Sequence, residues 1–541
     1  MTLLVLFSIL FISCKDNLND VKKDSISILA YFSRVSRSND YDIINVKFQI
    51  INNGESVYNA SPSISSSSGE LSALTSNNDG TYEFNLEPEA TGEYPVSISY
   101  KGFTYTRTPI VLSYVDSDWG QPMSVSGLVN TEGYEDGVTI TPDGEYLFVQ
   151  TGPHYFMGVF AMLASRENSG CGGALNRLSP TRCEHPWINN LIGSYTSPER
   201  PGFFDGRFNG TLMRHNANSW QVGDDIAPNY AMSTMFYGFK RQQDGTFKNP
   251  FYVAFEDEND ALINPFGLSF MMNNDGVTAT TTFTFNDPTD PDMVDFDGDG
   301  IVDAESYFDV YTSQIILGQN NILGKFVPSG TPGTHPVRGA NFNSTLVNFG
   351  KVGIEGIAGT QGNSHIYYDD NNNIKSIWVD DKFDSGGDHG ELSVHVLISG
   401  TFPNGIWQKV QLPTKVNIAG SSDEIQQFFT GSGLYFTRSG IINPEVWYIS
   451  YTGPQTAEGY ADNNNWGVAK KILGMDNIQE KGRIVTVGEP TIGIYNGETY
   501  LYFVYGYNRE FDGALPASTG LWDINMQAGY IKLNPQRIDF T

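Results

Sequence analysis

Residues 137–149 read GVTITPDGEYLFV, and this stretch decides the fold class. The β-branched and aromatic residues on either side of Pro142-Asp143-Gly144 are those that extended strands favour. The Pro-Asp-Gly segment favours a tight turn, because Pro sets φ for the turn and Gly tolerates the positive φ that follows. The stretch therefore predicts two strands joined by a turn and paired with each other.

The same order of strand, turn and strand recurs towards the C-terminus, at residues 363–379, 424–449 and 489–503. The three starts lie 61 and 65 residues apart. This period indicates stacked four-stranded sheets, because a single sheet cannot bury its own faces. The stretch from residue 137 resembles the TolB-like repeats of β-propellers, where an acidic residue, here Glu135 or Asp136, begins the innermost strand. The resemblance implies an all-β, multi-bladed β-propeller of five to seven blades over residues 117–541, with insertions near 160–225 and 285–345.

Residues 25–113 show a different pattern. Apolar residues alternate with polar ones in three short runs, which is the signature of half-buried strands; these residues are Ile44, Val46, Phe48, Ile50, Tyr82, Phe84, Leu86, Val96, Ile98 and Tyr100. The turn signal Asn78-Asp79-Gly80 precedes the second run. The segment 79–100 resembles a hairpin of bacterial immunoglobulin-like or filamin-like modules, which implies a small immunoglobulin-like β-sandwich that serves as a spacer.

The composition fits a large, acidic, strand-rich protein. The chain has 541 residues, 39% of them hydrophobic, and a formal net charge of −29. A length of this size predicts two or more domains. The negative charge excludes nucleic acid as a partner, because phosphates would be repelled.

The first 13 residues predict export. The apolar run 2–13 is too short to span a bilayer and suits a signal peptide. Phe11-Ile12-Ser13-Cys14 resembles the lipobox of bacterial lipoproteins, which implies cleavage before Cys14, acylation of that cysteine and a tether over 14–24. Lys15-Asp16-Asn17 resembles the export signal of Bacteroidetes surface lipoproteins. We expect a lipid-anchored protein of the outer membrane, facing outward or the periplasm.

Two further cysteines, Cys171 and Cys183, lie within one predicted insertion. In an oxidising compartment a lone pair of this kind favours a disulfide. A zinc site is the weaker alternative, because Zn²⁺ would need two more ligands at suitable spacing.

An acidic loop at 295–303 predicts a calcium site. Carboxylates at every second position, with a Gly at the sixth, suit a cation that takes six to eight oxygens. The expected ligands are Asp295, Asp297, Asp299, Ile301 and Asp303. The loop resembles the calcium loops of dockerins and thrombospondin-type repeats, so Ca²⁺ would be structural; a solvated acidic turn is the alternative.

The segment 160–220 is rich in arginine and aromatic residues, against the charge of the whole chain. Arginine forks bind carboxylate or sulfate groups in two-point contacts. The candidate ligand-binding residues are Arg166, Arg177, Arg182, His185, Trp187 and Arg207, together with Arg438 on a later blade. They indicate an anionic glycan surface, unless these arginines pair with the acidic remainder of the protein.

Acidic and histidine residues at the predicted strand starts are the candidate catalytic groups. In propellers the start of each inner strand faces the central funnel, where ligands bind. The candidates are Asp136, His365, Asp388, His389, Glu424 and Glu489. Paired carboxylates would serve glycoside hydrolysis, and a His with a Tyr would serve a lyase. The alternative for each residue is a structural role between blades.

These features lead to one main hypothesis and two alternatives. We expect a surface enzyme, a glycoside hydrolase or polysaccharide lyase, acting on an anionic polysaccharide, with an outer-membrane glycan uptake complex as a partner. A non-catalytic glycan-binding protein and a scaffold or adhesion propeller are the alternatives. Phosphate loops, dinucleotide fingerprints and zinc-protease motifs are absent from the sequence, which argues against those chemistries.

Overall fold

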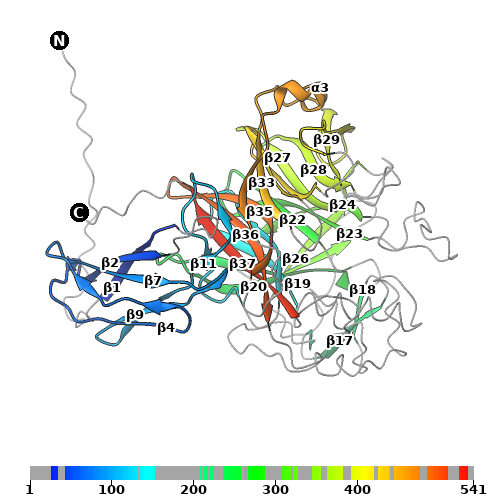
Figure 1. Cartoon of the computed structure of the whole chain (residues 1–541). Coiled ribbons are helices and arrows are strands. Elements are labelled where there is room, and N and C mark those ends of the chain that lie inside the picture. Colours follow the sequence, from blue (N-terminus) through cyan, green and yellow to red (C-terminus); the bar gives the residue numbers. More distant parts are fainter. Residues whose placement is uncertain are drawn as a thin grey trace, which may run out of the picture.

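The fold is all-β, with two parts that follow each other along the chain (Figure 1). The computed structural model describes residues 26–34, 43–130, 134–152, 207–208, 211–216, 219–222, 235–256, 262–263, 266–286, 308–318, 321–326, 344–354, 362–381, 391–418, 424–438, 444–475, 484–509 and 523–533. Within these ranges no helix has the length and apolar character that a bilayer crossing requires.

The first part is a β-sandwich. One sheet has the order β1-β2-β7-β5 and the other the order β10-β9-β4. Their bounds are β1 (Ile26–Phe32), β2 (Ile44–Asn52), β4 (Ser63–Ser66), β5 (Glu70–Leu71), β7 (Thr81–Glu87), β9 (Val96–Tyr100) and β10 (Phe103–Arg107), with the short strands β3 (Glu55–Ser56), β6 (Thr75–Ser76), β8 (Gly92–Glu93) and β11 (Ile110–Val111). The predicted alternation is confirmed, because Val46, Phe48 and Phe84 all lie in the core between the sheets. The immunoglobulin-like identity of this module stays a prediction.

The second part is a five-bladed β-propeller, within the five to seven blades expected. Blade 1 contains β14 (Tyr134–Ile140), β15 (Tyr146–Gly152), β19 (Met235–Arg241) and β20 (Phe247–Glu256). Blade 2 contains β22 (Phe266–Met272), β23 (Thr278–Asn286), β24 (Phe308–Ile316) and β26 (Ser344–Lys351). The strand β25 (Asn321–Phe326) pairs in parallel with β20 and β26 and joins these two blades at their outer edges. Outside blade 1 lie β16 (Arg207–Phe208), β17 (Thr211–Asn216), β18 (Ser219–Val222) and β21 (Leu262–Ile263).

The remaining blades follow in chain order. Blade 3 contains β27 (Gly362–Tyr368), β28 (Ile374–Asp381), β29 (Glu391–Ser399) and β30 (Ile406–Gln411). Blade 4 contains β31 (Glu424–Phe429), β32 (Gly433–Arg438), β33 (Glu445–Ser450) and β34 (Lys470–Gly474), with α3 (Ala457–Ala461) and the 3₁₀ turn η3 (Asn463–Asn465) before β34. Blade 5 contains β35 (Ile484–Tyr495), β36 (Glu498–Arg509) and β37 (Asp523–Lys532). Two strands from the start of the propeller, β12 (Tyr114–Val115) and β13 (Met123–Ser124), complete blades 4 and 5 from outside.

The ring of blades is closed. Each inner strand contacts the next, in the order β14, β22, β27, β31, β35 and back to β14. A separate hydrophobic cluster fills each junction between neighbouring blades. Between blades 5 and 1, for example, Tyr502 and Val504 of β36 pack with Leu147 of β15. Because these faces are buried only when neighbours stack, the five junctions hold the ring together.

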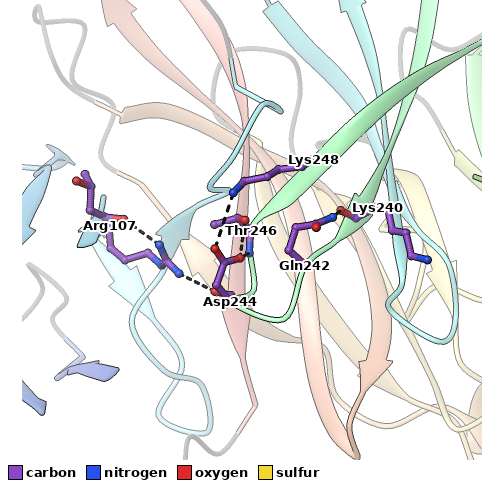
Figure 2. A network of polar contacts seen from close by, with 7 residues as sticks. Arg107, Lys240, Gln242, Asp244, Thr246 and Lys248 are labelled. Atoms are coloured by element: carbon purple, nitrogen blue, oxygen red, sulfur yellow. Dashed lines mark hydrogen bonds and ion pairs between the residues drawn. The ribbon is translucent and has the colours of Figure 1, made fainter. Parts of the chain in front are cut away.

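Polar contacts join the sandwich to the propeller. Figure 2 shows the guanidinium of Arg107, at the end of β10, donating to the main-chain oxygen of Asp244 in the β19–β20 turn over 2.9 Å. Lys248 lies 3.9 Å from the carboxylate of the same aspartate. Deeper in the junction, the Tyr505 hydroxyl of blade 5 donates to the Glu93 carboxylate of the sandwich. The two parts are therefore held in a defined arrangement.

A buried histidine makes this fold sensitive to acid. His395 on β29 has no exposed surface, and neither ring nitrogen has a hydrogen-bond partner among the described residues. Burial, and then the charge of Lys409, lowers the pKa of His395 to about 3. The folded protein thus keeps this ring neutral, while the unfolded chain takes up a proton below its ordinary value of about 6.5. Stability from this group is present above that value and is lost as the pH falls towards 3.

We expect the variant His395→Leu to be less sensitive to acid than the native protein. Leucine fits an apolar site and cannot take up a proton in the unfolded chain. The native protein should lose about 2 kcal/mol more than the variant between pH 7 and 5. Urea unfolding of both proteins at the two pH values measures this difference. Equal losses would show that His395 does not titrate as described.

Candidate active site

The candidate site is a cavity at the centre of the propeller. Its volume is about 270 Å³, and all five inner strands contribute to its wall. This is the funnel in which ligands were expected. Aromatic residues of blades 3 and 4 form one side, including Tyr367, Tyr368 and Phe428. The cavity is therefore a central and largely apolar site, the usual setting for a bound small molecule.

A β-bulge in each inner strand shapes this wall. The register shifts by one residue at the same place in all five strands. At each bulge one residue has a positive φ: Gly137 at 55°, Gly267 at 58°, Asn363 at 43°, Gln426 at 55° and Glu489 at 54°. The last three carry a side chain in a conformation that costs on the order of 1 kcal/mol or more. Such strain gathers at functional sites, and all five of these residues line the cavity.

Glu489 is held on this wall by hydrogen bonds to three neighbouring strands, two of which supply donors to its carboxylate. The Gly137 amide of β14 donates to its Oε2 over 2.5 Å, and the Gln426 amide of β31 donates to its Oε1. Its own main-chain N–H donates to the Thr437 hydroxyl over 2.8 Å. Bulges in three neighbouring blades thus fix one carboxyl group in place.

Asp136 lies beside Glu489, and the two side chains share a hydrogen bond. Burial raises the pKa of Asp136 to about 6. Burial, followed by the like charge of Asp136, raises the pKa of Glu489 well above its usual value. Two carboxyls in contact titrate as a unit, so the pair holds a proton to higher pH than a lone exposed carboxyl does. A carboxylic acid that stays protonated at pH 7 is a proton donor.

A third carboxylate acts on the pair from behind the wall. The charge of Asp380 on β28 also raises the pKa of Glu489. Asp380 is buried, and its Oδ2 accepts a hydrogen bond of 2.8 Å from the Asn363 amide. It does not line the cavity. Asp380 therefore influences the pair through its charge without being part of the cavity wall.

His365 lies on the wall but is already engaged. Its Nε2–H donates to the Phe429 carbonyl at 3.1 Å, which leaves Nδ1 as an acceptor 3.3 Å from the Ser269 hydroxyl. The ring also packs on Phe428 at a centroid distance of 4.1 Å. Burial lowers the pKa of His365 to about 4, so the ring is neutral at pH 7. With both nitrogens in use, His365 is placed to shape the wall rather than to move a proton.

Glu424 and Arg438, expected as catalytic and ligand-binding residues, form a buried ion pair with each other. Nε of Arg438 donates to Oε1 of Glu424 over 3.0 Å. The guanidinium also donates to the Val416 carbonyl, and the Ile418 amide donates to Glu424. Neither residue lines the cavity. These contacts give the ion pair a structural role inside blade 4.

Several expected site residues lie outside the described residues. They are Asp388 and His389; Arg166, Arg177, Arg182, His185 and Trp187; Cys14, Cys171 and Cys183; and the loop Asp295, Asp297, Asp299, Ile301 and Asp303. Arg207 is described only as the first residue of β16. The roles expected for all of them stay predictions. In the described part of the chain no three His, Cys, Asp or Glu side chains gather as a metal site.

Sequence reasoning placed Asp136 and Glu489 at inner strands but missed Gln426, Asn363 and Asp380. The five bulge residues are Gly, Gly, Asn, Gln and Glu. No single residue type therefore marks the bulge position in the sequence. The available signal was the start of each repeat, because Asn363 opens one of them and Glu489 another.

Comparison with known proteins finds distant structural similarity alone. No protein-family model and no curated protein matches the chain. The α-L-arabinofuranosidase of Lactobacillus brevis is 7% identical, with a TM-score of 0.33 over 74% of this chain and 92% of that one. The α-L-arabinanase of Cellvibrio cellulosa, in complex with arabinohexaose, is 11% identical, with a TM-score of 0.28 over 59% and 89%.

A family 117 glycoside hydrolase of Zobellia galactanivorans is 8% identical, with a TM-score of 0.32 over 76% of this chain and 89% of that one. Similarity at this level carries no argument about the reaction. The strand pairing and the ring of inner strands define the protein as a five-bladed propeller, with Glu489 on the wall of its central cavity and Asp136 beside it.

Proposed function

We propose that this chain is a glycoside hydrolase that acts on a polysaccharide. The observation that carries the proposal is Glu489 on the wall of the central cavity, whose pKa is raised by burial and by Asp136 beside it. In the proposal the two carboxyls keep one proton between them at neutral pH. Cleavage of a glycosidic bond needs such an acid, because the leaving oxygen must be protonated as the bond breaks.

In the proposed reaction, Glu489 gives its proton to the glycosidic oxygen while the bond from that oxygen to the anomeric carbon breaks. The oxygen of a water molecule forms the new bond to the anomeric carbon. The second proton of that water returns to the carboxyl pair, which regains its one-proton state. Asp136 keeps Glu489 protonated until the substrate binds, since two adjacent negative charges are costly in a buried site.

A second candidate function is glycan binding without catalysis, and one observation favours it. Hydrolases of this kind commonly hold two carboxyls about 5–10 Å apart, so that one donates a proton and the other acts on water or sugar. Asp136 and Glu489 are in direct contact instead. Of the other two acids expected in this role, Asp388 lies outside the described ranges and Glu424 does not line the cavity. The lyase alternative has less support, because both nitrogens of His365 are engaged.

The test uses the purified chain and a panel of neutral, uronic and sulfated polysaccharides. The release of reducing ends supports hydrolysis, and new absorbance from unsaturated uronates would point to a lyase. Retardation in affinity electrophoresis without products would overturn hydrolysis in favour of binding. Absence of both would leave the scaffold alternative.

We also propose that the protein is lipid-anchored through Cys14 at the outer membrane and supplies a glycan uptake system. The support is the short apolar run before Cys14 and the polar stretch after it. Labelled palmitate should be incorporated into the expressed chain and should be absent from the variant Cys14→Ser. Incorporation into both would refute the anchor site.

Calcium at residues 295–303 is a further proposal, supported by the alternating aspartates. Because a bound ion stabilises the folded state by mass action, EDTA should lower the melting temperature and added Ca²⁺ should restore it. The variant Asp297→Asn should lose most of this response. An unchanged melting curve would exclude a structural calcium site.

A further inference from the structure

We infer that the central cavity takes a single uncharged sugar ring, at the end of a glycan chain, by its hydroxyl groups. The inference rests on the proposed function and names the part of the substrate that the site holds. It departs from the expectation of an anionic glycan, which came from arginines in the segment 160–220 rather than from the funnel.

The size of the cavity argues for one ring. A volume of about 270 Å³ lies just below the range of about 300–1,000 Å³ typical of sites for drug-sized ligands. The walls come from the inner strands of all five blades, so the space is closed around its axis. A ring at the end of a chain can enter such a space from its mouth, whereas an internal segment of a chain must pass through it.

The charges on the wall argue against an anionic ring. No lysine or arginine occurs among the described residues that line the cavity. The nearest cation candidates are engaged elsewhere: Arg438 pairs with Glu424, and Arg241 lies among the rings of Tyr495, Tyr500 and Phe247. The ionisable groups that line the cavity include the neutral His365 and the acidic Glu489, and Asp136 lies beside Glu489. A carboxylate or sulfate there would be desolvated beside a like charge, without a cation to bind it.

Two buried polar atoms on the wall point to hydroxyl groups. The amide oxygen of Gln427 and the hydroxyl of Thr491 belong to lining residues, and neither has a hydrogen-bond partner in the part of the chain that the structure describes. An amide oxygen can only accept. A sugar hydroxyl can donate to it, whereas an ionised carboxylate or sulfate has no proton to give. The amide nitrogen of Gln427 is already engaged, since it donates to the Asn363 carbonyl over 2.7 Å, and this bond fixes the orientation of the amide group.

The aromatic side of the cavity fits the same ligand. Tyr367, Tyr368 and Phe428 offer ring faces and edges to the apolar C–H surface of a sugar. Burial raises the pKa of Tyr368 to about 12, so its hydroxyl stays neutral and can exchange hydrogen bonds with a sugar hydroxyl. An uncharged sugar ring therefore finds polar groups for its hydroxyls and aromatic rings for its C–H surface among the residues that line the cavity.

The experiment compares matched sugars that differ only at one carbon. Binding of methyl galactoside and methyl glucoside to the full chain is measured by calorimetry beside the corresponding galacturonide and glucuronide, with methyl arabinoside and xyloside as smaller neutral probes. At least one neutral probe should bind about tenfold or more tightly than either uronide. Equal or tighter binding of a uronide would overturn the inference.

Two variants separate charge from other causes. The double variant Asp136→Asn with Glu489→Gln removes the one negative charge of the pair and should reduce the preference for neutral over uronic probes by about tenfold. Glu55→Gln removes one exposed acid from the sandwich, on β3, and should leave the preference unchanged. A preference unchanged in this double variant would overturn the role of charge.

The inference and the proposed function can fail separately, because binding is measured without turnover. Neutral probes that bind while no polysaccharide is cleaved would support the inference and overturn hydrolysis. Cleavage that releases terminal uronic acids would support hydrolysis and overturn the inference. Cleavage within chains, without release of single sugars, would also overturn it.

Discussion

Replacing Glu489 by glutamine is expected to lower the rate of glycoside hydrolysis by about 10²–10⁴-fold, the usual contribution of a general acid. Glutamine keeps the shape of the side chain and an oxygen for the Gly137 amide, but it has no acidic proton. The binding of a neutral sugar should change much less than the rate. The measurement is kcat and KM on the best polysaccharide or aryl glycoside of the panel, and Glu55→Gln is the matched control.

The pH dependence gives this prediction a second readout. In the native protein the rate should fall as the pH rises through the pKa of Glu489, because the donor loses its proton. Asp136→Asn removes the like charge that helps to raise that pKa, so the alkaline fall should move to lower pH. A structural role for Glu489 would change the rate without moving the pH profile in Asp136→Asn. A rate within threefold of the native value in Glu489→Gln would refute the assignment.

The variant Glu489→Gln should be more stable than the native protein, although it is less active. Both pKa values of the pair are raised on folding, so the pair favours the native state at low pH. That contribution is lost as the pH rises from about 4 through the folded values. Glutamine does not ionise, and Glu489→Gln should therefore melt at a higher temperature than the native protein at pH 8. Such a trade between stability and activity is common for catalytic groups.

The comparison of Glu489 with Glu424 shows how far the sequence alone could reach. Both acids open a repeat, and their neighbours have similar apolar patterns. In the fold, Glu489 is itself the bulge residue, whereas Glu424 lies two positions before its bulge residue, Gln426. Glu135 lies at that same place before Gly137 and is also buried. An acid at the bulge residue thus lies on the cavity wall, whereas an acid two positions earlier lies inside the blade. The sequence does not show where the bulge falls, so the backbone structure is needed to tell the two apart.

The propeller itself was predictable, because it depends on features that short sequence windows carry. The Pro142-Asp143-Gly144 turn and the alternating strands give the hairpins, and the repeat period gives the blades. The junctions depend on pairs far apart in the chain, such as Tyr502 with Leu147. So do the donors that hold Glu489, which come from β14 and β31. Short sequence patterns do not specify which residues far apart in the chain come into contact.

Replacing Arg438 by methionine is expected to destabilise the protein by about 3–5 kcal/mol, the usual cost of leaving one member of a buried ion pair alone. Glu424 has 1% of its side chain exposed and Arg438 has 7%. Without the guanidinium, Glu424 keeps the Ile418 amide as a donor but loses the opposite charge of Arg438. The Val416 carbonyl also loses its donor, and the rings of Phe436 and Trp447 lose the cation that packs on them.

A double variant tests whether this cost comes from removing the charge of Arg438 while that of Glu424 stays. Glu424→Gln combined with Arg438→Met removes both charges, so its melting temperature should lie well above that of Arg438→Met alone. In Arg438→Met the loss should be smaller at pH 4 than at pH 7, because Glu424 can then take up a proton in the folded state. Thermal unfolding at both pH values measures these differences. If Arg438→Met stayed within 1 kcal/mol of the native protein, or if the double variant were no more stable, the ion pair would not hold blade 4 in the way its geometry requires.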